Sequence, residues 1–80
     1  MRTAKEMLIQ RMNEAEEAVD AGRYSIDRAI DETFGYLRGV CDALDLNGEE
    51  FEEMSRLWTA FHMSMHPAYK PARKSWREVV

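Results

Sequence analysis

One stretch of the chain, residues 25–46, constrains the fold most, because its apolar side chains recur every three or four residues. They are Ile26, Ile30, Phe34, Leu37, Cys41 and Leu44. This spacing places them on one face of an α-helix, and such a face must be buried against other helices. Similar stripes occur before and after this stretch. The sequence therefore predicts an all-α fold, a small antiparallel three-helix bundle. The predicted helices cover residues 4–21, 26–46 and 48–65.

Residues suited to the helix cap precede each predicted helix. They are Thr3, Ser25 and Asn47. The first and the third are each followed three residues later by a glutamate, which is the spacing of a capping box. Gly22 can take the left-handed conformation that ends a helix, and the short connection after it leaves room only for a reversal. We therefore expect consecutive helices to run antiparallel.

The length of the chain limits how much core it can form. Eighty residues make one small domain, which buries about 60% of the surface that the unfolded chain exposes. The side chains expected to be mostly buried are Phe34, Leu37, Cys41, Leu44, Met54, Trp58 and Phe61. Those left at the edges of the stripes are Met7, Ile9, Leu57 and Met63. Because three stripes carry more apolar residues than one small bundle hides, we expect a homodimer or larger assembly.

Two glycines, Gly35 and Gly39, lie inside the second predicted helix, where each costs up to about 1 kcal/mol relative to alanine. On a helical wheel they fall opposite the apolar stripe. One interpretation is a solvated face that tolerates glycine. The other is close approach of another helix or of the C-terminal segment to this face.

Charge divides the chain into two parts. Residues 1–66 hold 7 Lys/Arg and 14 Asp/Glu, a net charge of −7, whereas residues 67–80 have a net charge of +3. We therefore predict a three-helix acidic domain over 1–66 and a basic tail over 67–80. Aromatic residues alternate with the basic ones in the tail. We expect the tail to pack on the domain or on a partner, with Trp76 against an acidic helix face. Binding of single-stranded nucleic acid by stacking is the alternative for the tail.

The chain has one cysteine, Cys41, so it cannot form an intrachain disulfide. Its place on the apolar stripe predicts a small buried hydrophobe rather than a reactive thiol. The absence of a disulfide framework favours a reducing compartment, and we expect a cytoplasmic protein. No apolar window of about 20 residues occurs, and the first ten residues do not have the pattern of a signal peptide, so we expect no contact with a membrane.

No catalytic or cofactor motif is recognisable, and we predict neither enzyme activity nor a cofactor. His62 and His66 have the four-residue spacing with which a helix can bind a metal ion. The sequence dictates no third ligand, however, and histidines in the last turn of a helix are favoured by the helix dipole alone. We therefore predict no metal site, and a small metal-binding or metal-dependent helical enzyme is the alternative.

The acidic surface indicates the kind of partner. We expect a small non-enzymatic protein that regulates or inhibits a partner by binding a basic protein surface. A surface with which the partner binds nucleic acid is one such target, and small inhibitors from phages and other mobile elements work in this way. The acidic body disfavours direct binding to nucleic acid, which takes clustered Lys and Arg. The alternative is a structural subunit of a homo-oligomer. The expected contact residues are Glu14, Glu17, Asp20, Asp42, Glu49, Glu53 and Trp76.

Overall fold

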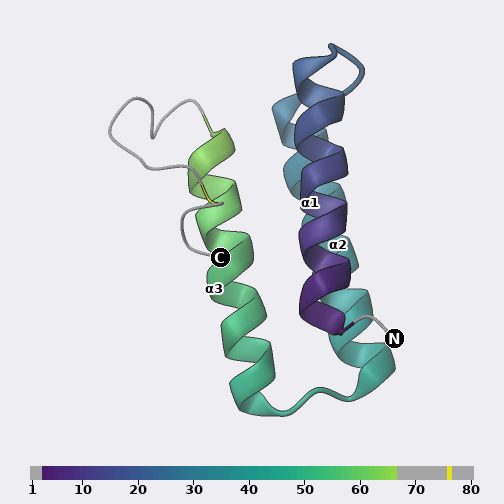
Figure 1. The fold of residues 1–80 in the computed structure, drawn as a ribbon, viewed down its shortest axis with the longest axis vertical. Helices are drawn as coiled ribbons and strands as arrows, with labels where there is room; N and C mark the ends of the chain where they lie inside the picture. The colour runs from purple at the N-terminus through teal and green to yellow at the C-terminus, as the bar shows by residue number, and fades with distance from the viewer. Residues whose placement is uncertain (1–2, 67–75, 77–80) are drawn as a thin grey trace.

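The computed structural model describes residues 3–66 and Trp76. Within this part of the chain, three helices follow one another: α1 (Ala4–Asp20), α2 (Ile26–Leu44) and α3 (Gly48–Met65). Consecutive helices run antiparallel, and α2 packs against both α1 and α3 (Figure 1). The direct interface between α1 and α3 is the smallest of the three. The predicted all-α three-helix fold is thus confirmed. None of these helices is long and apolar enough to cross a membrane.

Each helix begins after the residue that the sequence predicts as its cap. The Thr3 hydroxyl accepts a hydrogen bond from the Glu6 backbone N–H, and the Glu6 carboxylate accepts one from the Thr3 N–H, both at 3.1 Å. The Asn47 side chain accepts from the Glu50 backbone N–H at 2.8 Å. Gly22 has a φ of 78°, so the chain reverses after α1 through the expected left-handed conformation. Local sequence therefore sets these helix ends.

The end of α2 differs from the prediction by two residues. Asp45 adopts the left-handed conformation, with φ 50° and ψ 53°, and its backbone N–H bonds to the Cys41 carbonyl. This geometry stops the helix at Leu44. Aspartate is one of the few residues other than glycine that tolerate the left-handed region, because its short polar side chain can form local hydrogen bonds.

Side chains from all three helices form one core, which Trp76 completes. Its buried apolar members are Leu8, Met12, Ala15, Ala18, Ala29, Ile30, Leu37, Met54, Leu57, Phe61, Met65 and Trp76. Burial is therefore confirmed for Leu37, Met54 and Phe61. Leu57 was predicted at an edge but is only 3% exposed, because it lies one helical turn before Phe61 on the buried face of α3. Met63 is exposed, as expected for an edge residue.

Phe34 and Leu44 were predicted in the core, and the structure corrects this, since they are 41% and 51% exposed. The predicted apolar stripe of α2 is centred near Ile30 and Leu37 with Phe34 on one side, whereas the buried face of the structure extends to the other side, to Ala29 and Thr33. Successive residues of a helix are about 100° apart, so this shift turns Phe34 to the edge of the face. Leu44 is the last residue of α2, where no described element covers it.

Two more predicted core residues, Cys41 and Trp58, are only half-buried. Trp58 lies over Thr33, which is 2% exposed, and the indole N–H donates to the Thr33 hydroxyl at 2.9 Å. That hydroxyl in turn donates to the Ala29 carbonyl at 2.8 Å. Thr33 is the only buried polar residue among those that the structure describes, and its hydroxyl is hydrogen-bonded to both α2 and α3.

The two glycines of α2 face open space. No described atom lies within 4 Å of a Cβ placed on Gly35 or on Gly39, apart from atoms of their own helix and chain neighbours. This favours the interpretation of a solvated face. The predicted tail lies outside the described residues except for Trp76, so the division into a domain over 1–66 and a tail over 67–80 stays a prediction.

Candidate functional site

The outer face of α1 carries a row of exposed polar side chains, three or four residues apart. They are Glu6, Gln10, Glu14 and Glu17, and Asp20 follows at the end of the helix. The Gln10 amide donates to the Glu14 carboxylate at 3.0 Å. Within the described part of the chain, the Glu17 side chain makes no hydrogen bond or ion pair. We call Glu14 and Glu17 the acidic ridge.

A hollow lies on each side of the acidic ridge. The first, of about 720 Å³, lies between α1 and α2 and is open to solvent. The second, of about 560 Å³, is a shallow depression, widely open to solvent, along the flank of α1 that carries Ile9 and Asn13. Glu14 and Glu17 line both hollows. A side chain that enters from either side therefore meets the same two carboxylates.

The walls of the α1–α2 hollow also contain arginine and tyrosine side chains. The Arg11 guanidinium lies over the Tyr36 ring, 4.9 Å from its centroid. Arg23 and Tyr24, from the connection between the helices, line the hollow as well. Cation–π contacts of this kind hold aromatic and basic side chains in fixed positions. The hollow thus combines flat apolar rings with charges of both signs, an arrangement that suits a polar segment of a protein.

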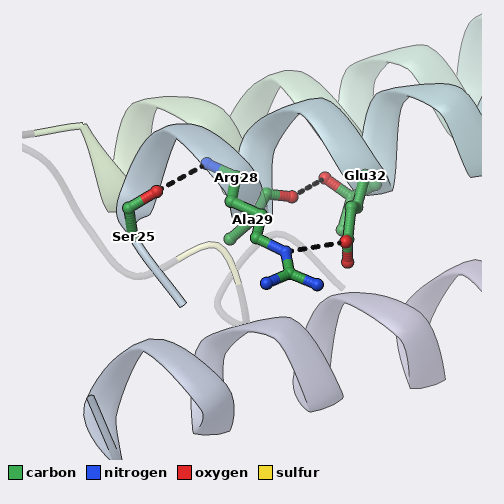
Figure 2. Close-up of polar contacts among 5 residues, drawn as sticks. Ser25, Arg28, Ala29 and Glu32 are labelled. Atoms are coloured by element: carbon green, nitrogen blue, oxygen red, sulfur yellow. Dashed lines mark hydrogen bonds and ion pairs between the residues drawn. The ribbon is translucent and has the colours of Figure 1, made fainter. Parts of the chain in front are cut away.

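Residues Glu32, Thr33 and Tyr36 of α2 line the hollow as well, and Figure 2 shows the polar contacts that hold the start of this helix. The Ser25 hydroxyl caps the helix by accepting from the Arg28 backbone N–H at 3.1 Å. The Arg28 side chain extends over the Tyr24 ring, at 4.0 Å, and its Nε donates to Glu32 at 3.0 Å. This hydrogen bond lowers the pKa of Glu32 and raises the pKa of Arg28. Arg28 thus pairs with Glu32, whereas Glu17 makes no ion pair within the described part of the chain.

The structure does not bring all the predicted contact carboxylates together. Glu53 forms an ion pair with Lys5 at 2.8 Å, which places the start of α3 beside the start of α1. Glu17 lies about 18 Å further along α1 at the helical rise of 1.5 Å per residue. The predicted carboxylates therefore form two groups. One contains Glu14, Glu17 and Asp20, and the other contains Asp42, Glu49 and Glu53, all of them exposed.

Pairing also distinguishes the two groups. The hydrogen bond from Lys5 lowers the pKa of Glu53, so this carboxylate is already paired within the protein. Asp42 and Glu49 lie at the same end of the bundle, on the last turns of α2 and the first turn of α3. The group on α1 therefore offers the better candidate surface, since two of its members, Glu14 and Glu17, line both hollows.

Trp76 was predicted to contact a partner, but its side chain is only 1% exposed. The indole N–H donates to Glu16 at 2.9 Å, and its ring meets the Phe61 ring edge-on at 5.8 Å. Trp76 therefore packs against α1, as expected for the tail, but it is a core residue in this structure. It contributes no exposed surface to the site.

His62 and His66 belong to a row of aromatic rings on α2 and α3. The Phe34 and Trp58 centroids are 4.9 Å apart, those of Trp58 and His62 5.2 Å, and those of the two histidines 5.7 Å. Among the described residues, no group of three or more His, Cys, Asp or Glu side chains is placed to hold a metal ion. The histidine pair therefore gains no third protein ligand from the described part of the fold.

Cys41 is half-buried near the end of α2. Burial, with a smaller contribution from the Asp42 charge, raises the pKa of its thiol. Because the thiolate is the reactive form, the raised pKa makes this cysteine less reactive than a free one. The predicted role as a small hydrophobe agrees with this environment.

Reasoning from the sequence found the ridge but missed the hollows and the α2 wall. The four-residue spacing of Tyr24, Arg28 and Glu32 was the available signal, since residues four apart are neighbours on a helix. No local sequence pattern indicated that this wall lies beside α1. Comparisons with protein-family models, with curated proteins and with solved structures found no match for the chain.

Proposed function

We propose that this protein is a non-enzymatic interaction module that regulates or inhibits a partner by binding a basic surface on it through the acidic ridge. One observation carries the proposal: Glu14 and Glu17 line both hollows, and Glu17 is without an ion pair in the described structure. A lysine or arginine that enters either hollow meets the Glu17 carboxylate, which makes no ion pair within the described part of the protein.

The chemistry of the ridge favours arginine and lysine as its ligands. A guanidinium binds a carboxylate through two parallel hydrogen bonds, which adds direction to the charge attraction. The net charge of −7 on residues 1–66 attracts a basic surface over a longer range and raises the association rate. A partner surface that holds phosphate groups is rich in the same basic side chains. A protein that occupies such a surface would block the binding of nucleic acid to it. We propose that this role is carried out in the cytoplasm.

A comparative pull-down tests the proposal. The bait is the full chain, in wild-type form, as the ridge variant Glu14→Lys/Glu17→Lys, and as the control Asp31→Lys/Glu52→Lys. Both variants change the net charge equally, and the four positions are exposed on helix surfaces. Mass spectrometry should find a protein with a basic surface that the wild type and the control retain and the ridge variant loses. Circular dichroism verifies that all three baits are folded.

The salt dependence of the captured complex gives a second measurement. Screening shortens the Debye length from about 10 Å at 0.1 M salt to about 3 Å at 1 M. The association rate should therefore fall steeply as salt rises, and less steeply for the ridge variant. An affinity that changes neither with the salt concentration nor with the Glu14→Lys/Glu17→Lys substitutions would refute electrostatic binding through α1.

A structural role in a homo-oligomer is the second candidate, and a separate observation favours it. Large apolar side chains are exposed in the described structure, namely Phe34, Leu44, Phe51 and Met63, each at least 41%. Burial of such side chains between copies would add to the limited core of a small domain. Sedimentation should then show a mass above 9.4 kDa at micromolar concentration. A 9.4 kDa species at high micromolar concentration would exclude the assembly.

A further inference from the structure

The side of the bundle between α1 and α3 is built differently from the other two sides. These helices share the smallest direct interface, and Trp76 belongs to the core cluster that joins them. The indole is 1% exposed, and its plane lies at 76° to the Phe61 ring of α3, with the centroids 5.8 Å apart. Edge-to-face packing of this kind is favourable beyond the area that it buries. We call the space that the indole fills the α1–α3 slot.

The slot matches the chemistry of an indole. A tryptophan side chain has one polar group, an N–H donor, on an otherwise apolar ring system. In the slot, this N–H donates to the Glu16 carboxylate of α1 at 2.9 Å, across 60 residues of sequence. A hydrogen bond to an ionised acceptor is stronger than one between neutral groups. The slot therefore offers an apolar wall at Phe61 and an acceptor at the position that the ring requires.

We propose that the α1–α3 slot is a tryptophan-binding site, which Trp76 occupies within the chain and which also accepts a tryptophan on a basic segment of a partner protein. The groups that contact the indole belong to α1 and α3, so a tryptophan that is not part of this chain can make the same contacts. The acidic charge of residues 1–66 favours a basic segment around the incoming ring. The slot is separate from the acidic ridge, so the inference goes beyond the proposed function and does not rest on it.

An occupant within the same chain competes with one from outside. A covalently attached ligand acts at an effective concentration of about millimolar, so an external tryptophan binds the wild-type protein weakly. Removing the Trp76 ring should open the slot and raise the affinity for an external tryptophan. Trp76 then acts as a built-in competitor that a partner must displace.

The test uses the full-length Trp76→Ala protein and a synthetic peptide with the sequence of residues 70–80. Isothermal titration calorimetry should show binding to this variant, and affinity at least about tenfold lower for the wild type, whose slot is filled. Adding Glu16→Leu to the variant should weaken binding about tenfold through the lost hydrogen bond. Adding Glu52→Leu instead should leave binding within about twofold, because Glu52 is exposed and belongs neither to the slot nor to the acidic ridge.

Two outcomes would overturn the proposal. One is a folded Trp76→Ala protein that does not bind the peptide, and the other is equal binding of a peptide in which alanine replaces the tryptophan. If the variant is unfolded, circular dichroism measures whether the peptide restores its helical structure. Folding induced by the peptide would support the tryptophan-binding site, and a chain that stays unfolded at millimolar peptide would refute it. Because no variant here changes Glu14 or Glu17, a failure leaves the proposed function of the ridge untouched.

Discussion

Replacing Thr33 with valine tests the part-buried hydrogen bond that joins α2 to α3. The Thr33 hydroxyl accepts from the Trp58 indole N–H at 2.9 Å and donates to the Ala29 carbonyl at 2.8 Å. Valine has nearly the same shape as threonine, so the substitution should open no cavity. The carbonyl loses only a second hydrogen bond, since it keeps its bond within the helix. The substitution therefore isolates the loss of the acceptor for the indole.

The magnitude follows from the position of Trp58. A buried donor left without a partner costs about 1–3 kcal/mol. Trp58 is half-buried, so water can partly replace the hydroxyl, and we expect the lower part of this range, about 1–2 kcal/mol. For a domain of this size, each kcal/mol lowers the melting temperature by about 4–8 °C. The melting temperature of Thr33→Val should therefore fall by about 4–16 °C.

A double-mutant cycle with Trp58→Phe provides the assay, with unfolding in urea followed by circular dichroism. Phenylalanine removes the N–H, so Thr33→Val should cost less than about 0.5 kcal/mol in the Trp58→Phe background. Thr33→Ser, which keeps the hydroxyl, should retain the coupling to Trp58. Equal costs of Thr33→Val in the two backgrounds would show that the hydrogen bond contributes nothing, and would refute the reasoning.

Three further predictions follow from single sites. Leu37→Ala should lower the free energy of unfolding by about 2–5 kcal/mol, because Leu37 is 2% exposed. An unchanged thermal melt would show that Leu37 does not contribute to the core. Gly35→Ala should raise that free energy by up to about 1 kcal/mol, because its Cβ meets open space, and chemical denaturation measures the gain. The Lys5–Glu53 pair should contribute stability above the unfolded-state pKa of about 4.3, and this contribution should be lost as the pH falls through the lower folded-state pKa of Glu53. Lys5→Met should flatten this part of the stability curve in melts from pH 3 to 7 (about the range in which glutamate titrates).

The sequence by itself determined where the helices begin and how the chain reverses. Thr3 and Asn47 cap their helices with hydrogen bonds to residues three positions away, and Gly22 forms the turn through its own backbone conformation. These features depend on neighbours in the chain, so local patterns reveal them. The exposed carboxylates Glu14 and Glu17 were also predicted, because their positions on α1 follow from helical periodicity alone.

The tertiary structure alone decided which part of each apolar stripe is buried and what the surface carboxylates face. Phe34 is exposed because α2 turns Ala29 and Thr33 toward the core, and the rotation of a helix depends on the shapes of its neighbours. The hollow between α1 and α2 and the slot filled by Trp76 likewise form between separate elements of the chain. No periodic pattern encodes such contacts, because they arise from the packing of side chains whose partners are known only once the chain is folded.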